Sequence, residues 1–172
     1  SYPIDIIDSF KILSSECVVL DNIDYGKISS NWRFVFDTNK EKGRAGMSAA
    51  IAYFGMNGYT VSLPLNDTQD YDLVIEKDNV FKKVQCKATG SLDGKIDFRI
   101  TSGKLGGIET NNLLNTQIDI LFCLNQNGTM YCIPFEDIVA TGNKSGIKLK
   151  EEPLSKFANK NCLDTYKYIV TL

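Results

Sequence analysis

The sequence predicts an α/β fold in which a helix packs on a central mixed β-sheet. The chain has 172 residues, a length that fits one ordinary domain with a sizeable hydrophobic core. Residues 43–59 are largely apolar and helix-compatible, whereas residues 71–89 and 118–135 each contain two strand-like runs around a turn. We therefore expect residues 43–138 to hold the helix and the sheet, within a single domain spanning residues 1–172.

The N-terminal region predicts two strands and a polar link. Residues 17–23 and 31–36 are strand-like, and the turn-forming segment DYGKISS lies between them. The second strand places three aromatic side chains on one face, either in the core or against bases or a partner subunit: Trp32, Phe34 and Phe36. Residues 37–44 are polar and charged, and we expect them to link this strand to the helix.

The helix predicted over residues 43–59 carries apolar residues around much of its circumference, so we expect it to be buried on more than one face. Gly58 suits the position that follows the end of a helix. A strand over residues 59–65 and a turn-rich loop over residues 66–70 are expected next.

Two hairpins and a loop are predicted after this strand. The first hairpin pairs residues 71–77 with residues 79–89 across a tight KDN connection. The Gly-rich residues 102–117 predict a mobile loop over a site, with a short helix. The remaining predicted elements are strands over 96–101, 118–125 and 129–135, a short helix over 135–143 and a final strand over 166–172.

The composition excludes several classes of chemistry. The chain has no histidine, which excludes Ser-His-Asp and Cys-His triads, imidazole bases and histidine-ligated zinc. The five cysteines are odd in number and form no C-x-x-C pair, so we expect reduced thiols in an intracellular, cytoplasmic protein. Any chemistry must then rest on carboxylates, lysine, tyrosine, serine or an oxygen-bound metal.

Charge and hydropathy limit the partners. No apolar run is long enough to span a membrane, and the N-terminus lacks a basic segment followed by an apolar one. We therefore expect neither a membrane partner nor an export signal. The net charge is −2, whereas nucleic-acid-binding proteins are usually basic, so binding to nucleic acid would require a local basic face.

The first hairpin carries polar side chains where a plain strand would carry apolar ones. Gln85 and Lys87 are two residues apart and point to the same face of the sheet, where Asp72 on the neighbouring strand can meet them. Val84 and Cys86 then point into the core on the other face. The pattern predicts a carboxylate, an amide and an ammonium group gathered at one edge of the sheet.

This arrangement suits phosphodiester hydrolysis with a divalent cation. Asp72 can bind the metal, and either the Gln85 side-chain oxygen or the Cys86 backbone carbonyl can complete its oxygen ligands. Such a metal lowers the pKa of a bound water, while Lys87 orients that water or stabilises charge in the transition state. An ordinary surface-facing hairpin also accounts for these residues, and the spacing alone leaves both interpretations open.

Residues 43–138 resemble the core of the PD-(D/E)XK nuclease superfamily, in the branch that writes its motif as D…QxK. That branch includes intron-encoded homing endonucleases and resolvase-like proteins, and typically has a helix, a GY.V..P…YDL segment and a strand ending in VQ.K. The segment IDILFCLNQNGTMYCIP resembles a further family pattern downstream. The matching residues are Gly58, Tyr59, Val61, Pro64, Tyr71, Asp72, Leu73, Val84, Gln85, Lys87, Asp119, Tyr131, Ile133 and Pro134.

The resemblance implies a restriction-endonuclease-like core, with additions at residues 1–42 and 143–172 for DNA recognition or dimer contacts. It also implies a Mg²⁺- or Mn²⁺-dependent endonuclease that cuts double-stranded DNA as a homodimer. The catalytic residues would be those of the motif: Asp72, Gln85 and Lys87. Basic side chains near the first hairpin and the Gly-rich loop are expected to contact phosphates: Lys83, Arg99 and Lys104.

One departure from the family pattern concerns the first helix. The family usually places a metal-supporting glutamate there, and Met47 occupies that position in this chain. A thioether is no useful ligand for Mg²⁺, and Glu41 lies too far along the chain to replace it. Met47 therefore leaves four interpretations: catalysis without this residue, a replacement elsewhere in the chain, an engineered change, or an inactive nuclease-like module that binds DNA or a protein. RNA also stays open as a substrate. Asp119 fits either a group beside the site or a structural pair.

Overall fold

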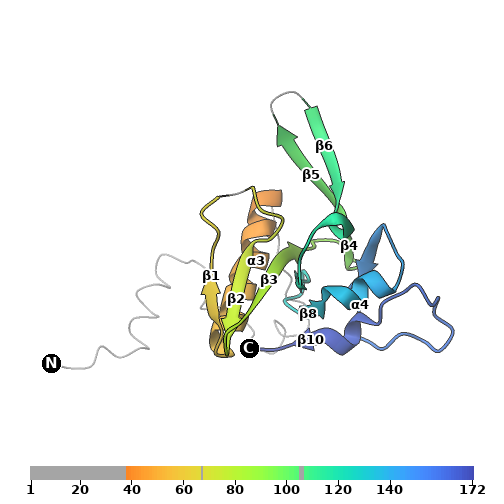
Figure 1. Ribbon diagram of the computed structural model, residues 1–172. Coiled ribbons are helices and arrows are strands. Elements are labelled where there is room, and N and C mark those ends of the chain that lie inside the picture. The colour runs from red at the N-terminus through yellow and green to blue at the C-terminus, as the bar shows by residue number, and fades with distance from the viewer. Residues whose placement is uncertain (1–37, 67, 105–106) are drawn as a thin grey trace, which may run out of the picture. The chain divides into compact units, whose positions relative to one another are not determined.

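The structure is a computed structural model that describes residues 38–66, 68–104 and 107–172, with side chains described outside residues 100–111 (Figure 1). The described residues all belong to one structural unit. The strands predicted over residues 17–23 and 31–36, with their aromatic face, lie outside them. None of the described helices has the length and apolar character that crossing a bilayer requires.

Helix α3 (Asn39–Met56) begins earlier than the predicted residues 43–59 because its N-terminus is capped. The Thr38 Oγ1 accepts a hydrogen bond from the Glu41 N–H at 3.2 Å, and Glu41 Oε2 accepts one from the Thr38 N–H at 3.0 Å. This reciprocal pair is a capping box, which satisfies two backbone donors at the helix start. The polar link predicted over residues 37–44 is therefore wrong, because most of these residues form the first turns of α3.

The other end of α3 agrees with the sequence. Gly58 follows the helix with a φ of +78°, a left-handed conformation that glycine adopts without strain, which confirms its predicted place. The fully buried residues of the helix form one stripe with a spacing of four: Gly46, Ala50 and Phe54. Ile51, on another face, is 37% exposed. The expectation of burial on several faces is wrong, because the residues of α3 outside this stripe are half-buried or exposed.

Six strands form one mixed sheet in the order β1-β2-β3-β7-β8-β10. They are β1 (Thr60–Ser62), β2 (Leu73–Lys77), β3 (Val80–Ala88), β7 (Ile120–Leu124), β8 (Met130–Pro134) and β10 (Ile169–Val170). β3 and β7 are parallel, whereas the other neighbouring pairs are antiparallel. Helix α3 packs across β1, β3 and β7. The mixed sheet and both predicted hairpins are confirmed.

The connection between β2 and β3 is a tight turn, as predicted. Asp78 and Asn79 have φ values of 54° and 62°, and both therefore adopt the left-handed conformation that a type I′ hairpin turn requires. β1 is shorter than the strand predicted over residues 59–65. Its expected C-terminal part leaves the sheet, with Leu63 and Leu65 exposed to 52% and 103%.

Between β3 and β7 the chain forms β4 (Lys95–Asp97), β5 (Arg99–Lys104), β6 (Gly107–Asn112) and the 3₁₀ helix η2 (Leu113–Asn115). β5 and β6 pair with each other in a hairpin that rises beside β4 (Figure 1). The mobile loop predicted over 102–117 is wrong except for its short helix, and the strand predicted over 96–101 is two strands. The prediction failed because β5 and β6 pair with each other through backbone hydrogen bonds, while their polar sequence lacks the apolar alternation that indicates a strand.

The C-terminal region contributes α4 (Phe135–Ala140), β9 (Gly146–Lys148) and the 3₁₀ helix η3 (Thr165–Tyr168). The short helix predicted over residues 135–143 is confirmed. The final strand predicted over residues 166–172 is confirmed only as the short β10. β9 was not predicted; it pairs with β4 so that Ile147 lies opposite Ile96, and both side chains are buried.

Two hydrophobic cores lie on the two faces of the sheet, because alternate residues of β7 belong to different clusters. The α3-side core includes Ala50, Phe54, Leu73, Ile75, Val84 and Phe122. The opposite core includes Phe98, Leu121, Tyr131, Ile133, Ile138 and Ile147. Val84 is part of the α3-side core and Cys86 packs against it, as the alternation of the first hairpin predicted. The described cysteines are free thiols, also as predicted: Cys86, Cys123, Cys132 and Cys162.

Gly46 marks a close approach of α3 to β3 and provides a test of this packing. A Cβ atom there would lie 3.2 Å from the Ala88 Cβ and 3.4 Å from the Lys87 carbonyl carbon and oxygen. Gly46→Leu is therefore expected to lower the free energy of unfolding by about 1–3 kcal/mol through overpacking. Gly43→Leu is the matched control, because nothing lies within 4 Å of its Cβ position.

The control should stabilise the protein by up to about 1 kcal/mol, because leucine has a higher helix propensity than glycine. Urea unfolding of both variants measures the difference. Equal changes in the two variants would contradict the close packing of α3 on β3.

Candidate active site

The Asp72 carboxylate is fixed to the strand beside it. Its residue precedes β2 directly, and its N–H donates to the Val84 carbonyl at 2.9 Å, which extends the β2–β3 pairing. Asp72 Oδ2 accepts hydrogen bonds from Gln85 Nε2 at 2.8 Å and from the Cys86 N–H at 2.7 Å. The structure thus brings the predicted aspartate and glutamine into direct contact at one end of the sheet. The Cys86 N–H is a contact that the sequence pattern did not indicate.

Lys87 belongs to the same face of β3 as Gln85, because the two residues alternate with core-facing neighbours. Its positive charge lies near enough to lower the pKa of the Asp72 carboxyl. Within the described part of the chain, the Lys87 ammonium forms no ion pair. Lys83 shares this face, but its Nζ lies 5.6 Å from the Tyr71 ring centroid, which is a cation–π contact.

Burial is the dominant influence on the Asp72 carboxyl. Desolvation raises its pKa, although the Cys86 N–H and the Lys87 charge both act to lower it. The ionised form is therefore under-compensated by the protein alone. A carboxylate in this state gains from a bound cation, and such perturbed groups are common at functional sites.

The oxygen atoms at this site fit a hard divalent cation. Among the described residues, no donor contacts Asp72 Oδ1 or the Gln85 side-chain oxygen, since the recorded hydrogen bonds use Asp72 Oδ2 and Gln85 Nε2. The described region contains no group of three or more Cys, Asp or Glu residues that could hold a metal. Mg²⁺ nevertheless binds proteins through one or two carboxylates and retains several waters.

The Cys86 thiol does not belong to this oxygen set. It packs against the α3-side core, and burial raises its pKa well above the usual range, so the thiol stays protonated. Only the backbone of Cys86 meets the site, through the N–H that donates to Asp72. The role of its carbonyl as a metal ligand stays a prediction.

Met47 lies in the middle of α3, beside the contact of this helix with Lys87. It follows Gly46, where an added Cβ atom would lie 3.2 Å from the Ala88 Cβ and 3.4 Å from the Lys87 carbonyl. Its side chain is half-buried and packs against the α3-side core. Met47 therefore lies on the helix that crosses the end of β3, with a packing role of its own.

Asp119 has a structural role that the sequence left open. Its Oδ2 accepts from the Lys83 N–H at 2.7 Å, and its own N–H donates to the Lys83 carbonyl at 2.9 Å. Its carbonyl accepts from the Phe135 N–H at 2.9 Å. Asp119 thereby ties the starts of β7 and α4 to β3, and it sets the register in which Gln85 and Lys87 are presented.

The predicted phosphate contacts outside β3 have mixed surroundings. The Arg99 guanidinium binds Asp97 through Nη2 at 2.6 Å and Nε at 3.0 Å, and it lowers the pKa of that carboxyl to about 2. Arg99 is therefore already paired with an anion. Lys104 is the last residue of β5, and its side chain lies outside the described side chains.

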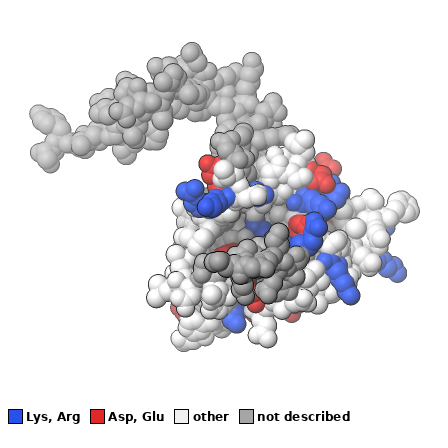
Figure 2. Space-filling model, turned by 90° about the horizontal axis from the view of Figure 1, so that it is seen from above, with Lys and Arg blue, Asp and Glu red and all other residues white. Residues whose placement is uncertain are grey.

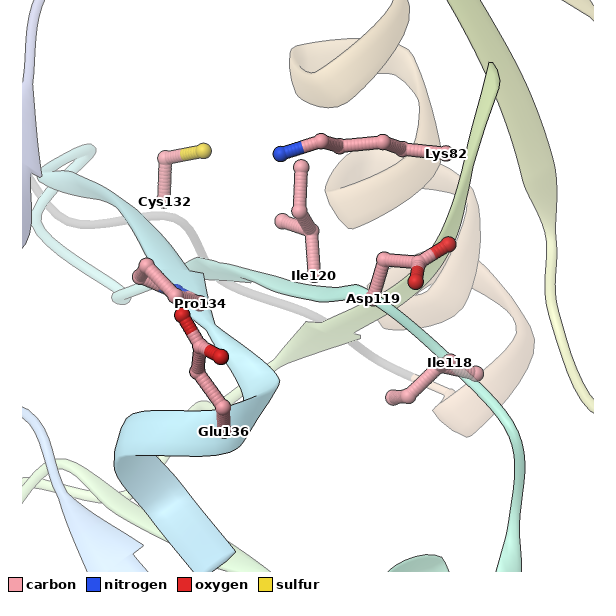
Figure 3. A pocket seen from close by; sticks show the side chains of 7 residues that line it. All are labelled: Lys82, Ile118, Asp119, Ile120, Cys132, Pro134 and Glu136. Atoms are coloured by element: carbon pink, nitrogen blue, oxygen red, sulfur yellow. The ribbon is translucent and has the colours of Figure 1, made fainter. Parts of the chain in front are cut away.

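A cavity of about 260 Å³ lies near the opposite end of β3, and the sequence did not indicate it. Figure 3 shows Lys82 extending over Ile120 toward Cys132, with Glu136 rising from the start of α4. Burial raises the pKa of Cys132 to about 11, while Lys82 opposes the shift. The catalytic residues predicted from the sequence are not among those that line this cavity.

Comparisons with known proteins agree with this fold. A family model described as PD-(D/E)XK endonuclease matches residues 37–169. The solved structure of a bacterial homing endonuclease, I-Ssp6803I, is similar with a TM-score of 0.59 and 23% sequence identity. The match covers 77% of this chain and 88% of that chain, and it supports the predicted restriction-endonuclease-like fold. No curated protein matches the chain.

The raised pKa of Asp72 predicts a pH-dependent change in stability. The folded-state pKa lies above the unfolded value, so the metal-free protein loses stability as the pH rises from the unfolded pKa through the folded one. Asp72→Asn removes this charge and should raise the free energy of unfolding at pH 7. The gain should vanish below the ordinary aspartate pKa of about 4.

Urea unfolding with chelator present, followed across pH, measures this gain. Asp70→Asn is the charge-matched control, because Asp70 is exposed and lies close by in the chain. A gain of the same size and pH dependence in both variants would contradict the burial of an under-compensated carboxylate.

Proposed function

This chain belongs to the PD-(D/E)XK endonuclease family, and on that premise we propose that it is a metal-dependent endonuclease that hydrolyses phosphodiester bonds in double-stranded DNA. One observation carries the proposal. Asp72 is half-buried and held by Gln85 and the Cys86 N–H, while Lys87 extends from the same face of β3. A homing, restriction or resolvase-like role is compatible with this chemistry.

Each residue of the site would have a different role in hydrolysis. Asp72 Oδ1 and the Gln85 side-chain oxygen would hold Mg²⁺ or Mn²⁺, and Gln85 Nε2 keeps the carboxylate in position. A bound divalent cation lowers the pKa of a water and offsets the negative charge of the scissile phosphate. Lys87 orients the attacking water or stabilises the charge that develops on phosphate oxygens. The water oxygen bonds to phosphorus and loses a proton, and the P–O ester bond breaks. One strand end keeps the phosphate, and the leaving oxygen takes up a proton to become a hydroxyl on the other end.

The distribution of charge supports a DNA substrate. The protein is acidic overall, with a net charge of −2. Seen from above, on the side toward which the β5–β6 hairpin rises in Figure 1, more of the described surface belongs to Lys and Arg than to Asp and Glu (Figure 2). Cutting both strands of a duplex requires two active sites, and a symmetric homodimer is the simplest source of them.

A second candidate function is a nuclease-like module that binds DNA or a protein without cutting. Met47 favours it, because a thioether occupies the helix position where the family resemblance places a glutamate.

Replacing the proposed metal ligand separates the two functions. Asp72→Asn should lower the cleavage rate by roughly 1,000-fold or more, because losing several kcal/mol of metal-dependent transition-state stabilisation has that effect. Supercoiled, linear and branched DNA should be tested as substrates with Mg²⁺, with Mn²⁺ and with chelator. Asp70→Asn makes the same charge change and should cut like the wild type. Unchanged cleavage by folded Asp72→Asn would refute the assignment of Asp72.

The Met47 position is tested by restoring an acid. If the carboxylate of Met47→Glu reaches the metal bound at Asp72 from α3, Mg²⁺ affinity and the cleavage rate should rise, because a second carboxylate there adds Coulomb attraction for the cation. Met47→Gln is the control for shape and polarity. Both variants should lose melting temperature in chelator, because the native side chain packs against the α3-side core. A lower melting temperature with no gain in cleavage for Met47→Glu would show that Met47 is only a packing residue.

A further inference from the structure

A lysine-rich surface lies on the outward face of the small sheet formed by β4 and β9. Ile96 and Ile147 pair across this sheet and are buried in the core. The neighbouring pair is Lys95 opposite Lys148, and alternation directs both away from that core. Like charges directly opposite each other destabilise a strand pair, so this pairing carries an energetic cost unless an anion lies nearby.

Asp93 is such an anion, but it forms an ion pair with only one of the two lysines. Lys148 Nζ lies 3.4 Å from Asp93 Oδ2, whereas Asp93 Oδ1 accepts a hydrogen bond from the backbone N–H of Lys95. In the part of the chain that the structure describes, the Lys95 side chain forms no ion pair. The same holds for Lys144 and Lys150.

Two hollows open between these lysines. The first, of about 460 Å³, is lined by Lys95, Asp97, Arg99, Asn112, Lys144 and Ser145. The second, of about 380 Å³, has Lys95 and Ser145 in its lining as well, together with Lys150 and the apolar Leu154 and Leu163. Because Lys95 and Ser145 line both, the two hollows adjoin, and we refer to them together as the depression.

Charges around this depression do not cancel. Arg99 is paired with Asp97, and Lys148 is paired with Asp93. The three remaining ammonium groups are Lys95, Lys144 and Lys150, and none of them forms an ion pair in the described region. The Lys95 charge acts on the Asp97 carboxyl, which is already paired with Arg99. A protein with a net charge of −2 therefore concentrates excess positive charge at one place.

The location connects this depression to the candidate active site. β4 follows β3 after a short segment that begins at Thr89, whose N–H donates to the Leu124 carbonyl at the end of β7. The last residue of the β5–β6 hairpin, Asn112, donates from its side chain to the Lys144 carbonyl at 2.9 Å. The depression thus lies at the foot of the hairpin, and the chain that forms it leaves the catalytic strand at its functional end.

We propose that Lys95, Lys144 and Lys150, which we call the lysine surface, bind backbone phosphates of duplex DNA away from the scissile bond. The inference rests on the proposed function, since the duplex is the same one that reaches Asp72. Lysine is suited to this task because it meets phosphate as a point charge without reading the base sequence. The lysine surface would position the duplex rather than select its sequence.

The salt dependence of DNA binding tests this proposal. Each phosphate contact contributes about 0.9 to the slope of log affinity against log salt concentration, so removing three contacts should reduce the slope by roughly 2.7. The variant is Lys95→Ala/Lys144→Ala/Lys150→Ala, assayed by fluorescence anisotropy with a labelled duplex in chelator. At about 0.1 M salt its affinity should fall by roughly 100-fold or more.

Two matched variants control for charge and for folding. Lys156→Ala/Lys160→Ala/Lys167→Ala removes the same number of exposed positive charges outside both hollows and should leave the slope within about one contact of the wild type. Lys95→Arg/Lys144→Arg/Lys150→Arg keeps the charges and should keep the slope. Circular dichroism and thermal melting confirm that each variant is folded.

The outcomes separate this inference from the proposed function. Suppose that the wild type binds and cuts duplex DNA, but both alanine variants change the salt-dependence slope equally. The proposed role of the lysine surface is then wrong, and the nuclease assignment stands. If the folded wild type neither binds nor cuts duplex DNA, both fail. A loss of slope confined to the lysine-surface variant, with Asp72→Asn still binding like the wild type, supports the proposal.

Discussion

Strand β3 has to satisfy two different environments at once, and the rest of the structure depends on how it does so. Its even-numbered residues Val84 and Cys86 pack in the apolar core under α3. Its odd-numbered residues Gln85 and Lys87 face the other way, at an end of the sheet where β7 but not β2 continues beside them. A slip of one residue would exchange these two sets, so the hydrophobic core itself enforces the orientation of the polar residues.

Several contacts hold this orientation against slippage. Asp119 forms two hydrogen bonds with the backbone of Lys83, where β3 and β7 begin to pair. Near the other end of β3, Gly46 allows α3 to pack closely against the backbone of Lys87. Asp72 then closes onto β3 from the other side through Oδ2. Ionising the partly desolvated Asp72 carboxyl costs free energy, and a bound cation would offset that cost in the proposed chemistry.

The parts of the molecule that follow from short-range patterns were predictable from the sequence. Alternation identified both hairpins, and it placed Asp72 and Gln85 on one face. The missed parts depend on other information. The start of α3 depends on a reciprocal side-chain cap, which the polar character of residues 37–44 concealed. The β5–β6 ribbon is stabilised by its own backbone pairing and shows no apolar alternation, and β9 is a strand only because distant β4 lies beside it.

The parallel pairing of β3 with β7 has a consequence for how the molecule forms and diversifies. The contact between Asp72 and Gln85 closes only 13 residues of chain, whereas the partner of Lys83 on the parallel side, Asp119, is 36 residues away. Closing a short loop costs less entropy than closing a long one, so the polar constellation can assemble with its own hairpin before the long crossover docks. That crossover can then lengthen, shorten or exchange its ribbon during evolution while the reactive groups keep their geometry.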